Sequence, residues 1–108
     1  MMNAPAIENS ESLSEVATGA WPILMQRSDI ITLKEAVHRT GKSDRTLRSW
    51  CRLFGISRQT NSGAPIEISA PALEMVMHGD MEALELLRSG NRHHPRVRRF
   101  FDHLGLSV

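Results

Sequence analysis

Residues 32–55 read TLKEAVHRTGKSDRTLRSWCRLFG, and the capping signals in this stretch predict two short helices joined by a tight turn. Thr32 and Glu35 have the spacing of a capping box, in which each side chain bonds the backbone N–H of the other residue, so a helix should begin just after Thr32. Gly41 can take the left-handed conformation that ends this helix, and Ser43 can cap the next one. The sequence therefore predicts a helix-turn-helix.

The second predicted helix has a basic side and an apolar side. At about 100° per residue, the basic side spans an arc of roughly 60° and contains Arg45, Arg48 and Arg52. The apolar side spans roughly 100° and contains Leu47, Trp50, Cys51 and Phe54. Because the second helix of a helix-turn-helix usually lies in the DNA major groove, the pattern predicts double-stranded DNA as the partner. A solvated basic face without a ligand is the alternative interpretation.

Positive charge is concentrated in two blocks, although the net charge of the 108-residue chain is only +1. Residues 27–62 contain eight Lys or Arg against three acidic residues, a net charge of +5. Residues 88–108 contain five Arg against one Asp, a net charge of +4. The first block coincides with the predicted helix-turn-helix, as expected for a surface that meets phosphate.

The length of the chain allows one small domain with a modest core. We expect a flexible acidic tail at residues 1–20, a DNA-binding domain at residues 21–90 and a basic amphipathic helix at residues 91–108. The apolar cluster Trp21–Met25 is expected to cover the core or to contact a second subunit. Cys51 is the only cysteine, and no signal segment or long apolar run is present. We therefore expect a cytoplasmic, nucleoid-associated protein without disulfides or membrane contact.

The segment after the second helix favours two short β-strands joined by a loop. Ile66 and Ile68 alternate with Glu67, and the Asn-Ser-Gly sequence at residues 61–63 is typical of a turn. Pro65 cannot donate a ladder hydrogen bond, which suits the start or edge of a strand. This would be a β-wing; an irregular loop between helices is the alternative.

Three further helices are expected in the last third of the chain. One places Leu73, Val76 and Met77 on a single face, and the next is capped by Asp80 and covers residues 81–89. The last one begins at a proline and has the cleanest amphipathic pattern, with Val97, Phe100, Phe101 and Leu104 on one side. That apolar side is expected to complete the core or to form a dimer seam.

The segments Thr32–Ala36, Gly41–Ser43 and Arg45–Trp50 resemble the winged helix-turn-helix of MerR-type regulators and phage excisionases. The resemblance implies a mainly α-helical fold: a small winged helix-turn-helix domain with a short two-stranded β-wing and additional C-terminal helices. It assigns residues 32–40 to the supporting helix and residues 43–54 to the recognition helix.

Two features of the chain depart from this family pattern. The predicted wing has no arginine at its tip and carries Glu67 on its second strand, so minor-groove insertion by the wing is not implied. The long dimerising helix and effector domain of MerR-type regulators have no counterpart in this sequence, so no small-molecule effector is expected.

The residues expected to contact DNA come from the turn, the recognition helix and the wing. They are Lys42, Ser43, Arg45, Thr46, Arg48, Ser49, Arg52, Arg58, Gln59 and Asn61. Further phosphate contacts are expected from the side of the last helix that carries Arg92, Arg96 and Arg99. That basic side could instead bind an acidic partner or be solvated.

No metal, cofactor or catalytic function is expected. His93, His94 and His103 do not match a zinc-ligand spacing, and no second cysteine is available. Phosphate-binding glycine loops, nucleophile elbows and metalloprotease motifs are also missing from the sequence. We expect sequence-specific DNA binding as a homodimer or cooperative oligomer, in a transcriptional regulator or an excisionase-like recombination factor. A protein-interaction adaptor or a small-terminase-like DNA-packaging subunit is the alternative.

Overall fold

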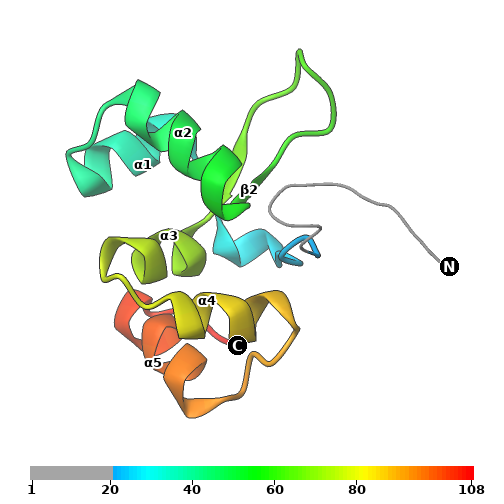
Figure 1. Ribbon diagram of the computed structural model, residues 1–108, viewed down its shortest axis with the longest axis vertical. Helices are drawn as coiled ribbons and strands as arrows, with labels where there is room; N and C mark the ends of the chain where they lie inside the picture. The colour runs from blue at the N-terminus through cyan, green and yellow to red at the C-terminus, as the bar shows by residue number, and fades with distance from the viewer. Residues whose placement is uncertain (1–20) are drawn as a thin grey trace, which may run out of the picture.

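A computed structural model describes residues 21–108 as a mainly helical fold with a small antiparallel sheet (Figure 1). The predicted tail at residues 1–20 lies outside the described residues. The elements in chain order are the 3-10 helix η2 (Arg27–Asp29), β1 (Ile30–Thr32), α1 (Leu33–Thr40), α2 (Asp44–Phe54), β2 (Ser57–Arg58), β3 (Glu67–Ser69), α3 (Ala70–Met77), α4 (Met81–Arg88) and α5 (Pro95–Leu104). Figure 1 shows α1 and α2 at one end of the molecule, α3 in the middle, and α4 and α5 at the other end.

The ends of α1 and α2 follow the predicted capping signals. The Thr32 hydroxyl accepts from the Glu35 backbone N–H at 3.0 Å, and Ser43 accepts from the Thr46 N–H at 3.1 Å. Gly41 ends α1 in the left-handed conformation, at a φ of 70°. Only half of the expected capping box forms, because the Glu35 carboxylate accepts instead from Arg39 Nε at 3.0 Å, one turn further along α1.

The sheet contains one strand more than predicted. β2 and β3 pair as an antiparallel hairpin, as expected, but β1 pairs with the other edge of β3, which gives the strand order β1-β3-β2. Ile68 in the central strand lies opposite Ile31 on one side and Ser57 on the other. Because β1 is only three residues long and leads directly into α1, its sequence shows no period that would reveal a strand.

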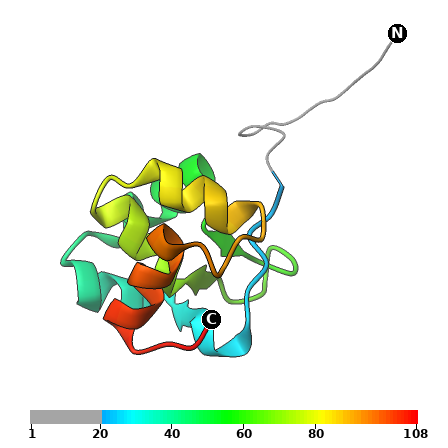
Figure 2. The same cartoon turned by 90° about the horizontal axis from the view of Figure 1, so that it is seen from below.

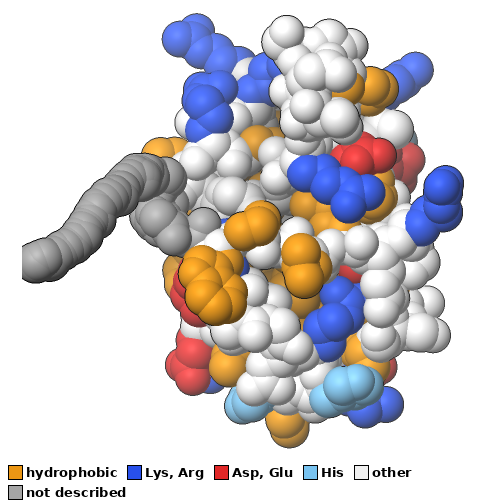
Figure 3. Space-filling view, turned by 90° about the vertical axis from the view of Figure 1, so that its right-hand side faces the viewer, with side chains coloured by type: hydrophobic (Ala, Val, Ile, Leu, Met, Phe, Trp, Pro, Cys, Tyr) orange, Lys and Arg blue, Asp and Glu red, His pale blue; other side chains and the backbone are white. Residues whose placement is uncertain are grey.

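Residues 21–26, which precede η2 and which we call the lead-in segment, lie partly in the core and partly on the surface. Ile23 is 5% exposed and belongs to the core, which agrees with the expectation that this cluster covers the core. Trp21 and Leu24, in contrast, project into solvent. Figure 3 shows large hydrophobic side chains gathered on this face of the molecule. At the other end of the chain, the Val108 carbonyl accepts from the Gln26 side chain at 3.2 Å, and Figure 2 shows the C-terminal end beside the lead-in segment.

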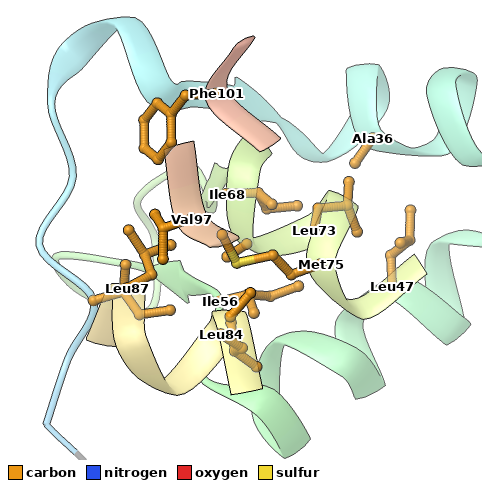
Figure 4. Packing of buried hydrophobic residues seen from close by; sticks show 13 residues of the cluster. Ala36, Leu47, Ile56, Ile68, Leu73, Met75, Leu84, Leu87, Val97 and Phe101 are labelled. Atoms are coloured by element: carbon orange, nitrogen blue, oxygen red, sulfur yellow. The ribbon is translucent and has the colours of Figure 1, made fainter. Parts of the chain in front are cut away.

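A single hydrophobic core joins the sheet to all five α-helices (Figure 4). Val97 and Phe101 on α5 are fully buried in this core, so the apolar side of α5 contributes to the core, while Phe100 and Leu104 on the same side are half-buried. The fully buried members from the rest of the core include Ala36, Leu47, Ile56, Ile68, Ala72, Met75 and Ala83. Residues 91–108 therefore fold together with the preceding helices.

A buried ion pair links η2 to the loop between α4 and α5. Arg92 Nη2 lies 3.3 and 3.2 Å from the two carboxylate oxygens of Asp29, whose side chain is only 2% exposed. The guanidinium also lies over the ring of Phe101, 4.6 Å from its centroid.

No helix in the described part of the chain is long and apolar enough to cross a membrane.

Candidate nucleic-acid interface

The two sides of α2 are divided as the helical periodicity predicts. Leu47 is fully buried, and the other apolar residues of the helix except Leu53 are half-buried. On the opposite side Arg45, Arg48 and Arg52 are exposed. The packing of the apolar side fixes the orientation of α2, so the arginine side is held toward solvent on a rigid helix.

The three arginines differ in how firmly they are held within the protein. Arg48 Nε lies 2.6 Å from the Asp44 carboxylate, but both side chains are more than half exposed. Arg45 and Arg52 form no ion pair with any of the described residues 21–108. Because an exposed ion pair contributes about 0–1 kcal/mol, the contact with Asp44 is weak enough for Arg48 to exchange it for a phosphate or a base.

The polar residues around the start of α2 mostly serve the helix itself. The Ser43 hydroxyl accepts the Thr46 N–H and donates to the Thr46 hydroxyl at 3.0 Å, and Ser49 is half-buried. Lys42 is exposed, and its ammonium lies 6.0 Å from the centroid of the Trp50 ring. Lys42 is therefore the residue of this group that is most available to an outside anion.

The loop between β2 and β3 extends beside α2 at the same end of the molecule (Figure 1). The Gln59 side chain donates to the Ala64 carbonyl at 2.7 Å, and the Asn61 side chain accepts from the Gly63 N–H at 3.0 Å, so both side chains shape the loop. Arg58 Nε lies 2.7 Å from the Glu67 carboxylate across the hairpin, and both side chains remain substantially exposed.

A groove of about 370 Å³ separates the loop from the helices. It runs past the start of α1 and is lined by Lys34, Arg48 and Gln59, together with Thr32, Leu33, Ser62, Ala64, Pro65 and Ile66. Lys34 was not among the expected contacts, because its place beside the loop depends on how α1 lies against the hairpin. The groove thus brings a basic residue from each helix to one concave surface.

Arg88 on α4 holds the C-terminal end of α2. Its guanidinium donates to the carbonyl of Phe54, the last residue of α2, and at 3.0 Å to the carbonyl of Trp21. The Arg88 side chain is 9% exposed, and its Nε also lies 3.3 Å from Glu85. This role of Arg88 could not be predicted from the sequence, because Arg88 and Phe54 are 34 positions apart.

Replacing Arg88 with methionine is expected to lower the free energy of unfolding by about 2–3 kcal/mol, because two backbone carbonyls lose a charged hydrogen-bond donor. Urea denaturation followed by circular dichroism measures this change. The matched replacement of Arg98, an exposed arginine on α5, should change stability by less than about 0.5 kcal/mol. Equal effects of the two replacements would contradict the role assigned to Arg88.

The arginines near the C-terminus do not join the α2 surface. Arg92 is mostly buried against Asp29, so the expected phosphate contact by this residue is replaced by an internal ion pair. Arg96 Nε lies 2.9 Å from Asp80, and its Nη1 lies 3.5 Å from Glu82. Arg99 is exposed, but α5 lies at the opposite end of the molecule from α2 (Figure 1).

Cys51 and the histidines provide no sign of reactive chemistry. Burial raises the pKa of the Cys51 thiol, outweighing the hydrogen bond with Ser57 and the charges of Arg48 and Arg52, so the thiol stays protonated at neutral pH. Within residues 21–108, no group of three or more His, Cys, Asp or Glu side chains is arranged to hold a metal ion. His94 accepts from the Arg96 N–H and thereby caps α5.

Comparisons of the chain with protein-family models, with curated proteins and with solved structures found no match.

Proposed function

We propose that this protein binds double-stranded DNA through α2, as the recognition helix of a winged helix-turn-helix in which the β2–β3 loop is the wing. The observation that carries the proposal is the exposed arginine side of α2, held outward by the buried Leu47 on the opposite side. An α-helix fits the major groove, and arginine is the side chain that most often reads guanine there.

The surroundings of α2 support this proposal. A three-residue turn, Gly41–Ser43, joins α1 to α2, which is the connection expected of a helix-turn-helix. In the proposed complex Arg45 and Arg48 meet base edges, while Lys34, Lys42 and Arg58 meet phosphates on either side of the groove. Such contacts with the backbone position a protein on the duplex, and base contacts supply the sequence preference.

We further propose that DNA binding serves transcriptional regulation or excisionase-like recombination. The resemblance of residues 32–50 to MerR-type and excisionase domains supports this role. A small-terminase-like packaging subunit would also bind DNA, and the two roles differ in the expected assembly, which is a ring for the packaging subunit and a dimer for the regulator.

Salt dependence of binding tests the proposal directly. Using fragments selected from genomic DNA, we expect the logarithm of the binding constant to fall linearly with the logarithm of the salt concentration, with a slope of about −0.9 for each phosphate contact. Fluorescence anisotropy at several salt concentrations gives the slope. Lys34→Ala should make the slope less negative by about 0.9, whereas Arg98→Ala on the opposite end should leave it unchanged. A chain that shows no binding at low salt would refute the proposal.

A further inference from the structure

We propose that a second copy of this chain docks on an exposed surface formed by Trp21, Leu24 and Leu53, which we call the apolar patch. The side chains of these residues are 74%, 78% and 65% exposed. Among residues 21–108, the other exposed large hydrophobic side chains, Met77 and Met81, are each only 38% exposed. Clustered apolar side chains of this kind mark interaction sites more often than isolated ones do.

The patch is a single surface because Arg88 joins its two parts. The Arg88 guanidinium bonds the carbonyls of Trp21 and Phe54, and so holds the lead-in segment against the end of α2 where Leu53 lies. Ile23, between the two exposed lead-in residues, is anchored in the core at 5% exposure. The backbone under the patch is therefore fixed, and its three hydrophobic side chains are exposed to solvent.

The charges around the patch favour a second copy over a different partner. On the α2 side, Arg52 is exposed and has no ion pair among the described residues, and on the α4 side the carboxylate of Glu85, which contacts Arg88, is 65% exposed. In a two-fold arrangement, Arg52 of each copy meets Glu85 of the other, so this pair of residues makes the surface complementary to itself.

The dimer seam formed by two apolar patches is compatible with DNA binding, and dimerisation through this seam does not require DNA. Leu53 lies eight residues after Arg45, about 12 Å further along α2. Docking through Leu53 therefore leaves the N-terminal end of α2, which carries Arg45, outside the seam in both copies. A dimer of this kind would read two half-sites in inverted order.

Sedimentation velocity of the full chain without DNA, over protein concentrations from about 1 to about 200 µM, tests the proposal. We expect the wild-type chain to dimerise and Trp21→Ser and Leu53→Ser each to raise the dissociation constant at least about tenfold. Trp21→Ser keeps the backbone carbonyl that Arg88 bonds, and Leu53 is exposed, so both variants should stay folded by circular dichroism. Met81→Ser, on α4 outside the patch, is the matched control and should associate as wild type does.

A charge exchange provides an independent test. Arg52→Glu should weaken the dimer, and adding Glu85→Arg to it should restore association, because the two charges are then exchanged. A wild-type chain that stays monomeric at every concentration overturns the proposal, including the case in which residues 1–20 cover the patch. A dimer that both serine variants leave unchanged also overturns it. Because no DNA is present, a failure of DNA binding would leave the result standing.

Discussion

The double replacement Arg45→Ala and Arg48→Ala is expected to abolish the proposed preference of this protein for selected target DNA over unrelated duplex. A bidentate contact between an arginine and guanine is worth about 1–3 kcal/mol of discrimination, and both arginines lie on the exposed side of α2. Competition binding with selected and scrambled duplexes measures the preference as a ratio of dissociation constants. That ratio should approach one in the double variant.

Residual affinity without preference is part of the expected result. Lys34, Lys42 and Arg58 remain in the double variant, and phosphate contacts bind every sequence about equally. Both replaced side chains are exposed, so the fold should be kept, apart from the weak contact between Arg48 and Asp44. Arg98→Ala is the control and should keep the full preference. If the double variant still distinguishes the target from scrambled DNA, α2 is not the recognition helix.

The α1–α2 pair was predictable because its signals are local. Thr32, Gly41, Ser43 and Gly55 each act on backbone groups within four residues, and the structure places the helix ends beside them. The three later helices were also predictable from local signals, namely the apolar periodicity, the Asp80 cap and Pro95, and in the structure each has a capping side chain at the residue before it. Local chemistry of this kind is visible in a sequence.

The features that the sequence did not reveal depend on residues far apart in the chain. Asp29 and Arg92 are 63 positions apart, and the charge pattern alone placed Arg92 on a basic surface with Arg96 and Arg99. Arg88 likewise belongs to the second basic block, yet it bonds the end of α2. The charge of a segment therefore shows where arginines are numerous, whereas the tertiary fold determines which of them are exposed to an outside partner.

Asp29→Asn is expected to lower the free energy of unfolding by about 3–5 kcal/mol, because it leaves the buried Arg92 guanidinium without its counter-charge. This is a large part of the stability of a small domain, which is about 5–15 kcal/mol in total. Arg92 Nε already has no hydrogen-bond partner among the described residues, so the guanidinium depends heavily on Asp29. Urea denaturation followed by circular dichroism measures the loss.

Two further variants separate the buried charge from a general effect of the substitution. Glu35→Gln removes the acidic partner of Arg39 from an exposed pair and should cost less than about 1 kcal/mol. Adding Arg92→Met to Asp29→Asn removes the uncompensated charge while keeping apolar contact with Phe101, so the double variant should be more stable than Asp29→Asn alone. If Asp29→Asn behaved like Glu35→Gln, the ion pair would not be what holds η2 to the loop between α4 and α5. In that case the burial of Ile23 and the hydrogen bond from Arg88 to the Trp21 carbonyl would have to hold the lead-in segment in place.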